Sequence, residues 1–168
     1  MNNIITINAD KLNRPASNLN YKKSRTMMYN ENTSISILIQ AFGRIDKTEK
    51  CINNVLKHTN LEYELILLDN GTPGTEITEY FASIDYKKKK VIRVSKNITG
   101  VYALDKVFKI LNSKYIVMIP NDVIVTPNWL ENKLICAESD ESIGMVVASS
   151  TNVSNLQYES LGGVSSIE

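Results

Sequence analysis

Short apolar runs alternate with amphipathic stretches from residue 34 onward, and this alternation constrains the fold of the 168-residue chain more than any other feature. Runs rich in β-branched residues are typical of strands buried on both faces. They predict strands at residues 35–39, 63–68, 90–94, 115–119 and 143–148, with a short extended piece at 123–125. Apolar residues at helical spacing predict helices at residues 46–58, 75–84, 99–111 and 127–137. Because strands that alternate with helices pair in parallel, the chain is predicted to be an α/β protein with a mostly parallel central sheet flanked by helices.

The first 33 residues do not share this pattern. They are polar, rich in Asn, Lys and Ser, and show no persistent period of strand or helix. We therefore expect residues 1–33 to be an N-terminal extension, partly ordered at best, and residues 34–168 to form the domain. The N-terminus has no apolar segment of the secretory type, and no apolar run approaches the roughly 18–20 residues that span a bilayer. This predicts a cytoplasmic protein without a transmembrane segment, for which peripheral membrane contact stays open.

Composition excludes several function classes. Lys and Arg number 19 and Asp and Glu 18, so the formal net charge of +1 gives no support to nucleic-acid binding. Cys51 and Cys136 are the two cysteines and His58 is the one histidine, and none of them stands in a metal-binding spacing. A disulfide framework, a zinc site and a histidine-based nucleophilic triad are therefore not expected.

In a parallel sheet, ligands bind beyond the carboxyl ends of the strands, near the point where strand order reverses. Two carboxylates follow predicted strands there, Asp69 and Asp122. Such an acid can accept hydrogen bonds from a base or ribose or can ligate a metal, but both also suit ordinary turns, and the residues alone leave this open. Neither a GxGxxG segment nor a P-loop occurs, which disfavours simple dinucleotide binding. The strand ends to inspect are residues 40–42, 69–71, 97–100 and 120–122.

Four segments, taken in order, match the motifs of one enzyme family. Residues 34–44, SISILIQAFGR, resemble the opening strand and Pro-Thr-Tyr-Asn-Arg turn of that family. Residues 64–72, ELILLDNGT, resemble its Glu-Ile-Ile-Val-Val-Asp-Asn-Gly-Ser segment, and Asn97 with Gly100 resembles its Asn-x-Gly element with one extra residue. Residues 115–130, YIVMIPNDVIVTPNWL, resemble its strand, Asp-x-Asp-type metal motif and Thr-Pro-x-Trp-Leu segment. In these four segments the chain resembles family-two glycosyltransferases, which have the A-type nucleotide-sugar-binding fold. The resemblance covers about residues 34–150 and identifies the chain as the N-terminal, donor-binding part of such an enzyme.

The resemblance implies a role for each matching position. Asp69 would contact the nucleotide base, and Asp122, as the last acid of the metal motif, would bridge Mg²⁺ or Mn²⁺ to the diphosphate of a nucleotide-sugar donor. A divalent cation suits this place because the leaving diphosphate develops negative charge. The remaining substrate-binding candidates are Gln40, Ala41, Phe42, Arg44, Asn97, Gly100, Lys106 and Asn121.

Three departures from the family pattern stand out. Residues 40–43, QAFG, replace Pro-Thr-Tyr-Asn, and Pro120 stands where the first acid of the metal motif is expected. Lys106 occupies the position of an Asn in the family; it could reach a phosphate or be a solvated helix lysine.

The catalytic base is not assigned, because in the family that acid lies much further along the chain than the residues that follow Asp122. The fold is therefore expected to be truncated on its C-terminal, acceptor side. The prediction is a domain that binds a nucleotide-diphosphate sugar and passes the sugar to an unknown glycan, lipid or protein acceptor if a base is supplied. Two alternatives remain: a non-catalytic module of the same fold that binds a nucleotide, sugar or partner protein, and an unrelated α/β domain such as a nucleotidyltransferase or a flavodoxin-like binder.

Overall fold

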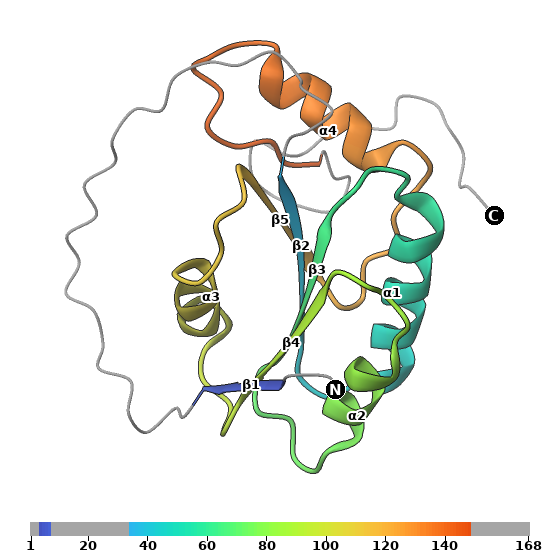
Figure 1. Ribbon diagram of the computed structural model, residues 1–168, viewed down its shortest axis with the longest axis vertical. Helices are drawn as coiled ribbons and strands as arrows, with labels where there is room; N and C mark the ends of the chain where they lie inside the picture. The colour runs from blue at the N-terminus through green and yellow to red at the C-terminus, as the bar shows by residue number, and fades with distance from the viewer. Residues whose placement is uncertain (1–3, 8–33, 149–168) are drawn as a thin grey trace, which may run out of the picture.

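A five-stranded, fully parallel sheet forms the centre of the molecule (Figure 1). The computed structural model describes residues 4–7 and 34–148. In chain order the elements are β1 (Ile4–Ile7), β2 (Ile35–Ala41), α1 (Ile45–His58), β3 (Glu64–Asp69), α2 (Glu76–Ser83), β4 (Lys89–Val94), α3 (Gly100–Phe108), β5 (Tyr115–Pro120) and α4 (Trp129–Glu138). The strand order is β1-β4-β3-β2-β5. The predicted fold class, an α/β protein with a parallel sheet and flanking helices, is confirmed.

The helices divide between the two faces of the sheet. In Figure 1, α1 and α2 lie on one side of the sheet and α3 on the other. Alternate residues of β2 serve the two faces: Ile37 and Ile39 pack with α1, α2 and α4, and Leu38 packs with α3. All three side chains are almost completely buried, which is why a continuous apolar run was the right signal for this strand.

The strands differ from prediction in two places. Residues 1–33 were expected to be an extension, partly ordered at best, and no strand was predicted there, but β1 pairs with β4 in parallel, with Ile4 opposite Val91. A four-residue run is too short to show a period, so only its pairing partner reveals it. Conversely, residues 143–148 form no strand, although their sequence favours one, and Met145 and Val147 are exposed. A β-prone sequence becomes a strand only where it makes ladder hydrogen bonds.

The helices differ from prediction mainly at their ends. Helix α1 begins one residue early, so Asp46 lies in the first turn and Arg44 is the N-cap, in a left-handed conformation with φ of 56°. Helix α4 begins at Trp129, and residues 123–125 form no element of their own. The domain boundary after residue 33 stays a prediction, and residues 1–3, 8–33 and 149–168 lie outside the described part of the chain.

Candidate functional site

The loops that follow β2, β3, β4 and β5 all leave the sheet at its carboxyl edge, because these strands are parallel. Along the chain, β3 and β4 are added on one side of β2, and β5 is then added on its other side. The strand order therefore reverses at β2, with Gln40 of β2 opposite Pro120 of β5. A crevice at this switch point is where open α/β sheets bind ligands. Asn121 and Asp122, which follow β5 directly, are thus placed at the switch point.

Asp69 ends β3, and its carboxylate is completely buried. Oδ1 accepts a hydrogen bond from the Thr72 amide at 2.8 Å, and Oδ2 accepts one from Thr78 Oγ1 at 2.6 Å. Oδ2 is also paired with the guanidinium of Arg93, which lies opposite Asp69 on β4. Because the carboxylate is completely buried among these groups, a ligand could contact it only if part of its surroundings moved away. The contact to a base stays a prediction.

Arg93 is a residue that the sequence analysis missed. Its Nη2 donates to two carbonyl oxygens of the β3–α2 turn, that of Thr72 at 2.9 Å and that of Gly74 at 2.7 Å, in addition to the pairing of Nη1 with Asp69. A planar guanidinium can make such forked contacts in fixed directions. Arg93 and Asp69 therefore fix the turn after β3. The available signal was a charged residue in the middle of an apolar strand run, where charges are rare unless paired.

A second set of contacts joins the turn after β3 to the loop after β4. The Asn70 side chain donates to the Ile98 carbonyl at 2.6 Å, and the Asn97 side chain donates to the Asn70 carbonyl at 3.2 Å. Between them, Gly71 has φ of 74°, and a Cβ on it would lie 2.2 Å from the carbonyl carbon of Lys96. Only glycine allows this close approach. Asn97 thus has a role in joining the two loops, while its own side chain stays largely exposed.

The candidates at the end of β2 take three different positions. The Gln40 amide lies against Gly100 at the start of α3: a Cβ on that glycine would be 3.3 Å from Gln40 Nε2. Ala41 is buried, and its carbonyl accepts from the Asn70 amide at 2.9 Å. Phe42 is 50% exposed, so an aromatic ring stands open at the strand end, where a base could stack on it.

Arg44 and Lys106 have different surroundings. The Arg44 side chain is largely exposed and forms a loose pair with Asp46, at 3.8 Å, which contributes little to stability. Lys106 is mostly buried along α3, where its ammonium lies 4.8 Å from the Tyr102 ring centre and 3.5 Å from Asp105. Arg44 is therefore available to an anionic ligand, whereas Lys106 would have to leave the ring and carboxylate of its own helix.

Of the two residues after β5, Asn121 is held by a contact within the protein and Asp122 is open to solvent. The Asn121 side chain donates to Thr48 Oγ1 of α1 at 2.7 Å. Asp122 is exposed, and its carboxylate has no hydrogen bond or ion pair with any residue that the structure describes. No group of three or more metal-ligating side chains occurs in residues 4–7 and 34–148. A single hard oxygen ligand fits a divalent cation that takes its other ligands from phosphates and water, which is how Mg²⁺ is commonly bound.

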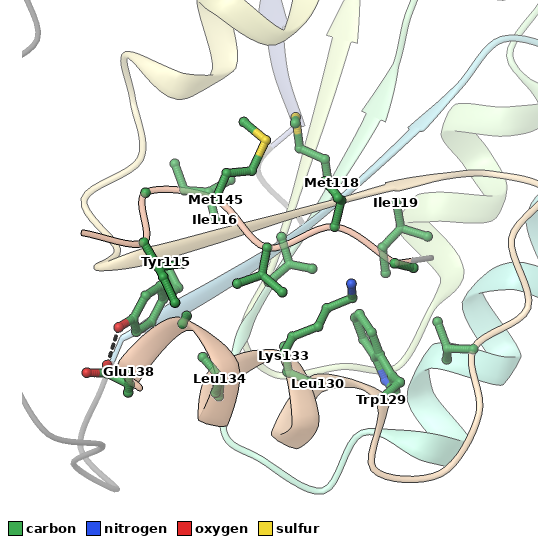
Figure 2. Close-up of a pocket in the computed structure, with 18 of the residues that line it drawn as sticks. Tyr115, Ile116, Met118, Ile119, Trp129, Leu130, Lys133, Leu134, Glu138 and Met145 are labelled. Carbon is green, nitrogen blue, oxygen red and sulfur yellow. Dashed lines mark hydrogen bonds between the residues drawn. The ribbon is translucent and has the colours of Figure 1, made fainter. Parts of the chain in front are cut away.

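A separate cavity of about 860 Å³ lies along the outer edge of β5, and we name it the β5 groove. It is bounded by β5, α4 and residues 143–148, and its wall is mainly apolar (Figure 2). Figure 2 shows Lys133 extending from α4 toward β5, and the Tyr115 hydroxyl bonded to Glu138 at one end of the groove. Hydrogen bonds from Lys114, at 2.6 Å, and from Tyr115 hold the pKa of Glu138 below its usual range. The groove contains none of the candidate site residues; it adjoins the Asp122 turn only through Pro120 and Val123.

Comparison with known protein families identifies the family of this chain. The family model described as glycosyl transferase family 2 matches residues 36–159. The chain belongs to glycosyl transferase family 2. This confirms the resemblance carried by the strand-end motifs. No curated protein matches the sequence significantly.

Solved structures support the fold of this family 2 domain. The crystal structure of S. aureus TarS 1-349 matches with a TM-score of 0.53 and 14% sequence identity, over 63% of this chain and 32% of that chain. The chain thus spans about a third of the length of that relative, and at this identity the likeness concerns the fold alone. In the described part of the family 2 domain, no helix is long and apolar enough to cross a membrane.

Replacing Arg93 by Met tests the buried ion pair. We expect a loss of about 3 kcal/mol in the free energy of unfolding, because Asp69 would keep a buried charge without its cationic partner. Urea unfolding followed by circular dichroism measures this loss. Arg44→Met, at an arginine with 66% side-chain exposure, is the matched control and should change stability by less than about 0.5 kcal/mol. Equal stability of the two variants would show that the pair does not stabilise the turn.

Gly71→Ala tests the close approach of the two loops. A Cβ at this position meets backbone atoms, so we expect it to cost about 2 kcal/mol more than Gly43→Ala. Gly43 also has a positive φ, of 63°, but a Cβ there has open space around it. The difference between the two variants in urea unfolding therefore isolates the contact from the cost of the left-handed backbone. Equal losses would contradict the packing described here.

Proposed function

We propose that this family 2 domain binds a nucleotide-diphosphate sugar across the carboxyl ends of β2, β3, β4 and β5. The observation that carries the proposal is the exposed, unpartnered carboxylate of Asp122, within the described residues, at the switch point between β2 and β5. A group that is solvated and unpaired at this place can accept a ligand without breaking an existing contact. At the end of β2, Phe42 and the Gln40 amide add neutral groups, and the exposed Arg44 adds a positive charge.

The base would lie over the end of β2. Phe42 offers an exposed ring for stacking, and the Gln40 amide, beside the start of α3, offers both a donor and an acceptor. Asp69 would support this position indirectly, because it holds the turn after β3 through the Thr72 amide. Its carboxylate is completely buried, so it would reach the base itself only if the surrounding groups moved away.

The diphosphate would lie toward Arg44 and Asp122. Asp122 would hold Mg²⁺ or Mn²⁺, and such a cation neutralises the negative charge that develops on a leaving diphosphate. Arg44, the N-cap residue of α1, adds a fixed positive charge from the protein. The sugar would then face the β5 side of the crevice, where a glycan, lipid or protein acceptor would approach with a base to take its proton.

One observation favours a second candidate, a module that binds the nucleotide without transferring the sugar. Pro120 occupies the position of the first acid and cannot ligate a metal, so the described part of the chain offers one carboxylate at this place. Release of nucleoside diphosphate from the donor, measured with and without added acceptor candidates, separates the two. Binding without any turnover would favour the module.

Thermal-shift titration with UDP-, GDP-, dTDP- and CMP-linked sugars, each with and without Mn²⁺, tests the proposal. We expect at least one donor to stabilise the protein more strongly with Mn²⁺ than without it. A ligand at about 100 times its Kd adds about 2.7 kcal/mol to the free energy of unfolding. Asp122→Asn should abolish the metal-dependent part of this gain and leave the metal-independent part.

The matched control is Asp85→Asn. Asp85 is exposed and precedes β4, so it lies at the opposite edge of the sheet and should leave both parts of the response unchanged. The same metal-dependent gain in Asp122→Asn as in the wild type would refute the assignment of Asp122. No response of the wild type to any of the donors would refute nucleotide-sugar binding itself.

A further inference from the structure

Two buried side chains of α1 hold the residues that directly precede Asp122. Thr48 and Cys51 are both 0% exposed and are three residues apart on the helix, so they point from the same face. Thr48 Oγ1 accepts from the Asn121 side chain at 2.7 Å. Cys51 Sγ donates to the Pro120 carbonyl, with a separation of 3.5 Å.

The Thr48 hydroxyl can only accept a hydrogen bond from Asn121 and cannot donate one to it. It donates its proton to the Arg44 carbonyl at 2.9 Å, so toward the loop it can only accept. The Asn121 amide must therefore present its nitrogen to Thr48, which fixes the orientation of the whole amide group. One hydroxyl thus joins the first turn of α1 to the turn after β5.

The contact from Cys51 works together with a turn hydrogen bond. The Pro120 carbonyl also accepts from the Val123 amide at 3.2 Å, which closes the turn around residues 121 and 122. The Cys51 thiol is completely buried and donates to the same carbonyl. Helix α1 therefore holds the turn carrying Asp122 at two consecutive residues, at the carbonyl of Pro120 and at the side chain of Asn121.

We propose that Thr48 and Cys51 are positioning residues that fix the turn carrying Asp122 and thereby set the affinity for the metal-dependent part of donor binding. This inference rests on the proposed function of Asp122. Asp122 belongs to no group of three or more His, Cys, Asp or Glu side chains in the described residues, so the orientation of this one carboxylate matters for a bound cation. Partners behind a metal ligand typically change metal affinity by 10–100-fold.

Thr48→Val is the first test, because it keeps the shape of the side chain and removes the hydroxyl. With the donor that gives the largest shift among UDP-glucose, GDP-mannose and dTDP-glucose as probe, we expect about 10-fold weaker affinity in the presence of Mn²⁺. Affinity for the same probe without metal should stay within about twofold. Thr48→Ser, which keeps the hydroxyl, should restore the metal-dependent affinity. A merely structural role would lower both affinities together or neither.

Asn121→Ala serves as the second variant, because it removes the same hydrogen bond from a half-buried loop residue and leaves the core intact. Cys51→Ala and Cys51→Ser form a matched pair at the other contact, since serine retains a donor. We expect the alanine variants to lose metal-dependent affinity and Cys51→Ser to retain most of it.

Hydrogen exchange provides a readout that does not depend on any ligand. In Thr48→Val and Asn121→Ala the Val123 amide should exchange faster, while amides of β2 and β3 keep their protection. Unchanged exchange and unchanged metal-dependent affinity would overturn the positioning role and leave the proposed function intact. If the exchange changes occur as expected but the wild-type protein binds none of the probes more tightly with Mn²⁺, the proposed function is overturned. The role of Thr48 and Cys51 in metal binding is then overturned with it.

Discussion

Parallel pairing on both edges of β2 is the constraint on which the rest of the structure depends. β2 pairs with β3 from Ser36 to Ala41 and with β5 from Ile35 to Gln40, and its apolar residues are buried on both faces. Such a strand has no face or edge left for solvent. Because its neighbours must run in the same direction, their polar ends are delivered to one edge of the sheet. The candidate site is therefore a consequence of strand direction before it is a matter of any single side chain.

The two halves of this edge are held in physically different ways. On the β3–β4 side, a buried ion pair and two asparagine side chains join the loops, and the donors to Asp69 leave its charge no exposure to water. Displacing any of these groups would leave a buried polar atom unsatisfied, which is costly. On the β5 side, the loop is held through Pro120 and Asn121, and Asp122 itself remains free among the described residues. The β3–β4 side is thus fixed through the charged group itself, whereas on the β5 side the turn is fixed through the residues before Asp122 and its carboxylate stays solvated.

The sequence predicted those features that follow from period and from turn chemistry. Strand and helix alternation gave the parallel sheet, and strand ends gave the edge at which Asp69 and Asp122 lie. It did not predict features that depend on register between distant segments. Arg93 meets Asp69 only because β4 pairs with β3 in one particular register, and Thr48 meets Asn121 across 73 positions of sequence. The strand predicted at residues 143–148 was wrong because pairing, too, cannot be read from a local pattern. Their sequence suits a strand, but no strand of the described structure pairs with them.

Pro120 lies between the β5 groove and the turn that carries Asp122. In the described structure β5 is an end strand of the sheet, and its exposed Ile116 and Met118 face the β5 groove. A free strand edge can accept another strand, but proline has no amide proton to donate to a ladder. The Pro120 carbonyl is already used by Cys51 and Val123. Any pairing along this edge must therefore stop before Asn121, which keeps the Asp122 turn open. The residue that departs from the acid of the family motif thus has a structural reason to be there: it ends the sheet where the candidate binding turn begins.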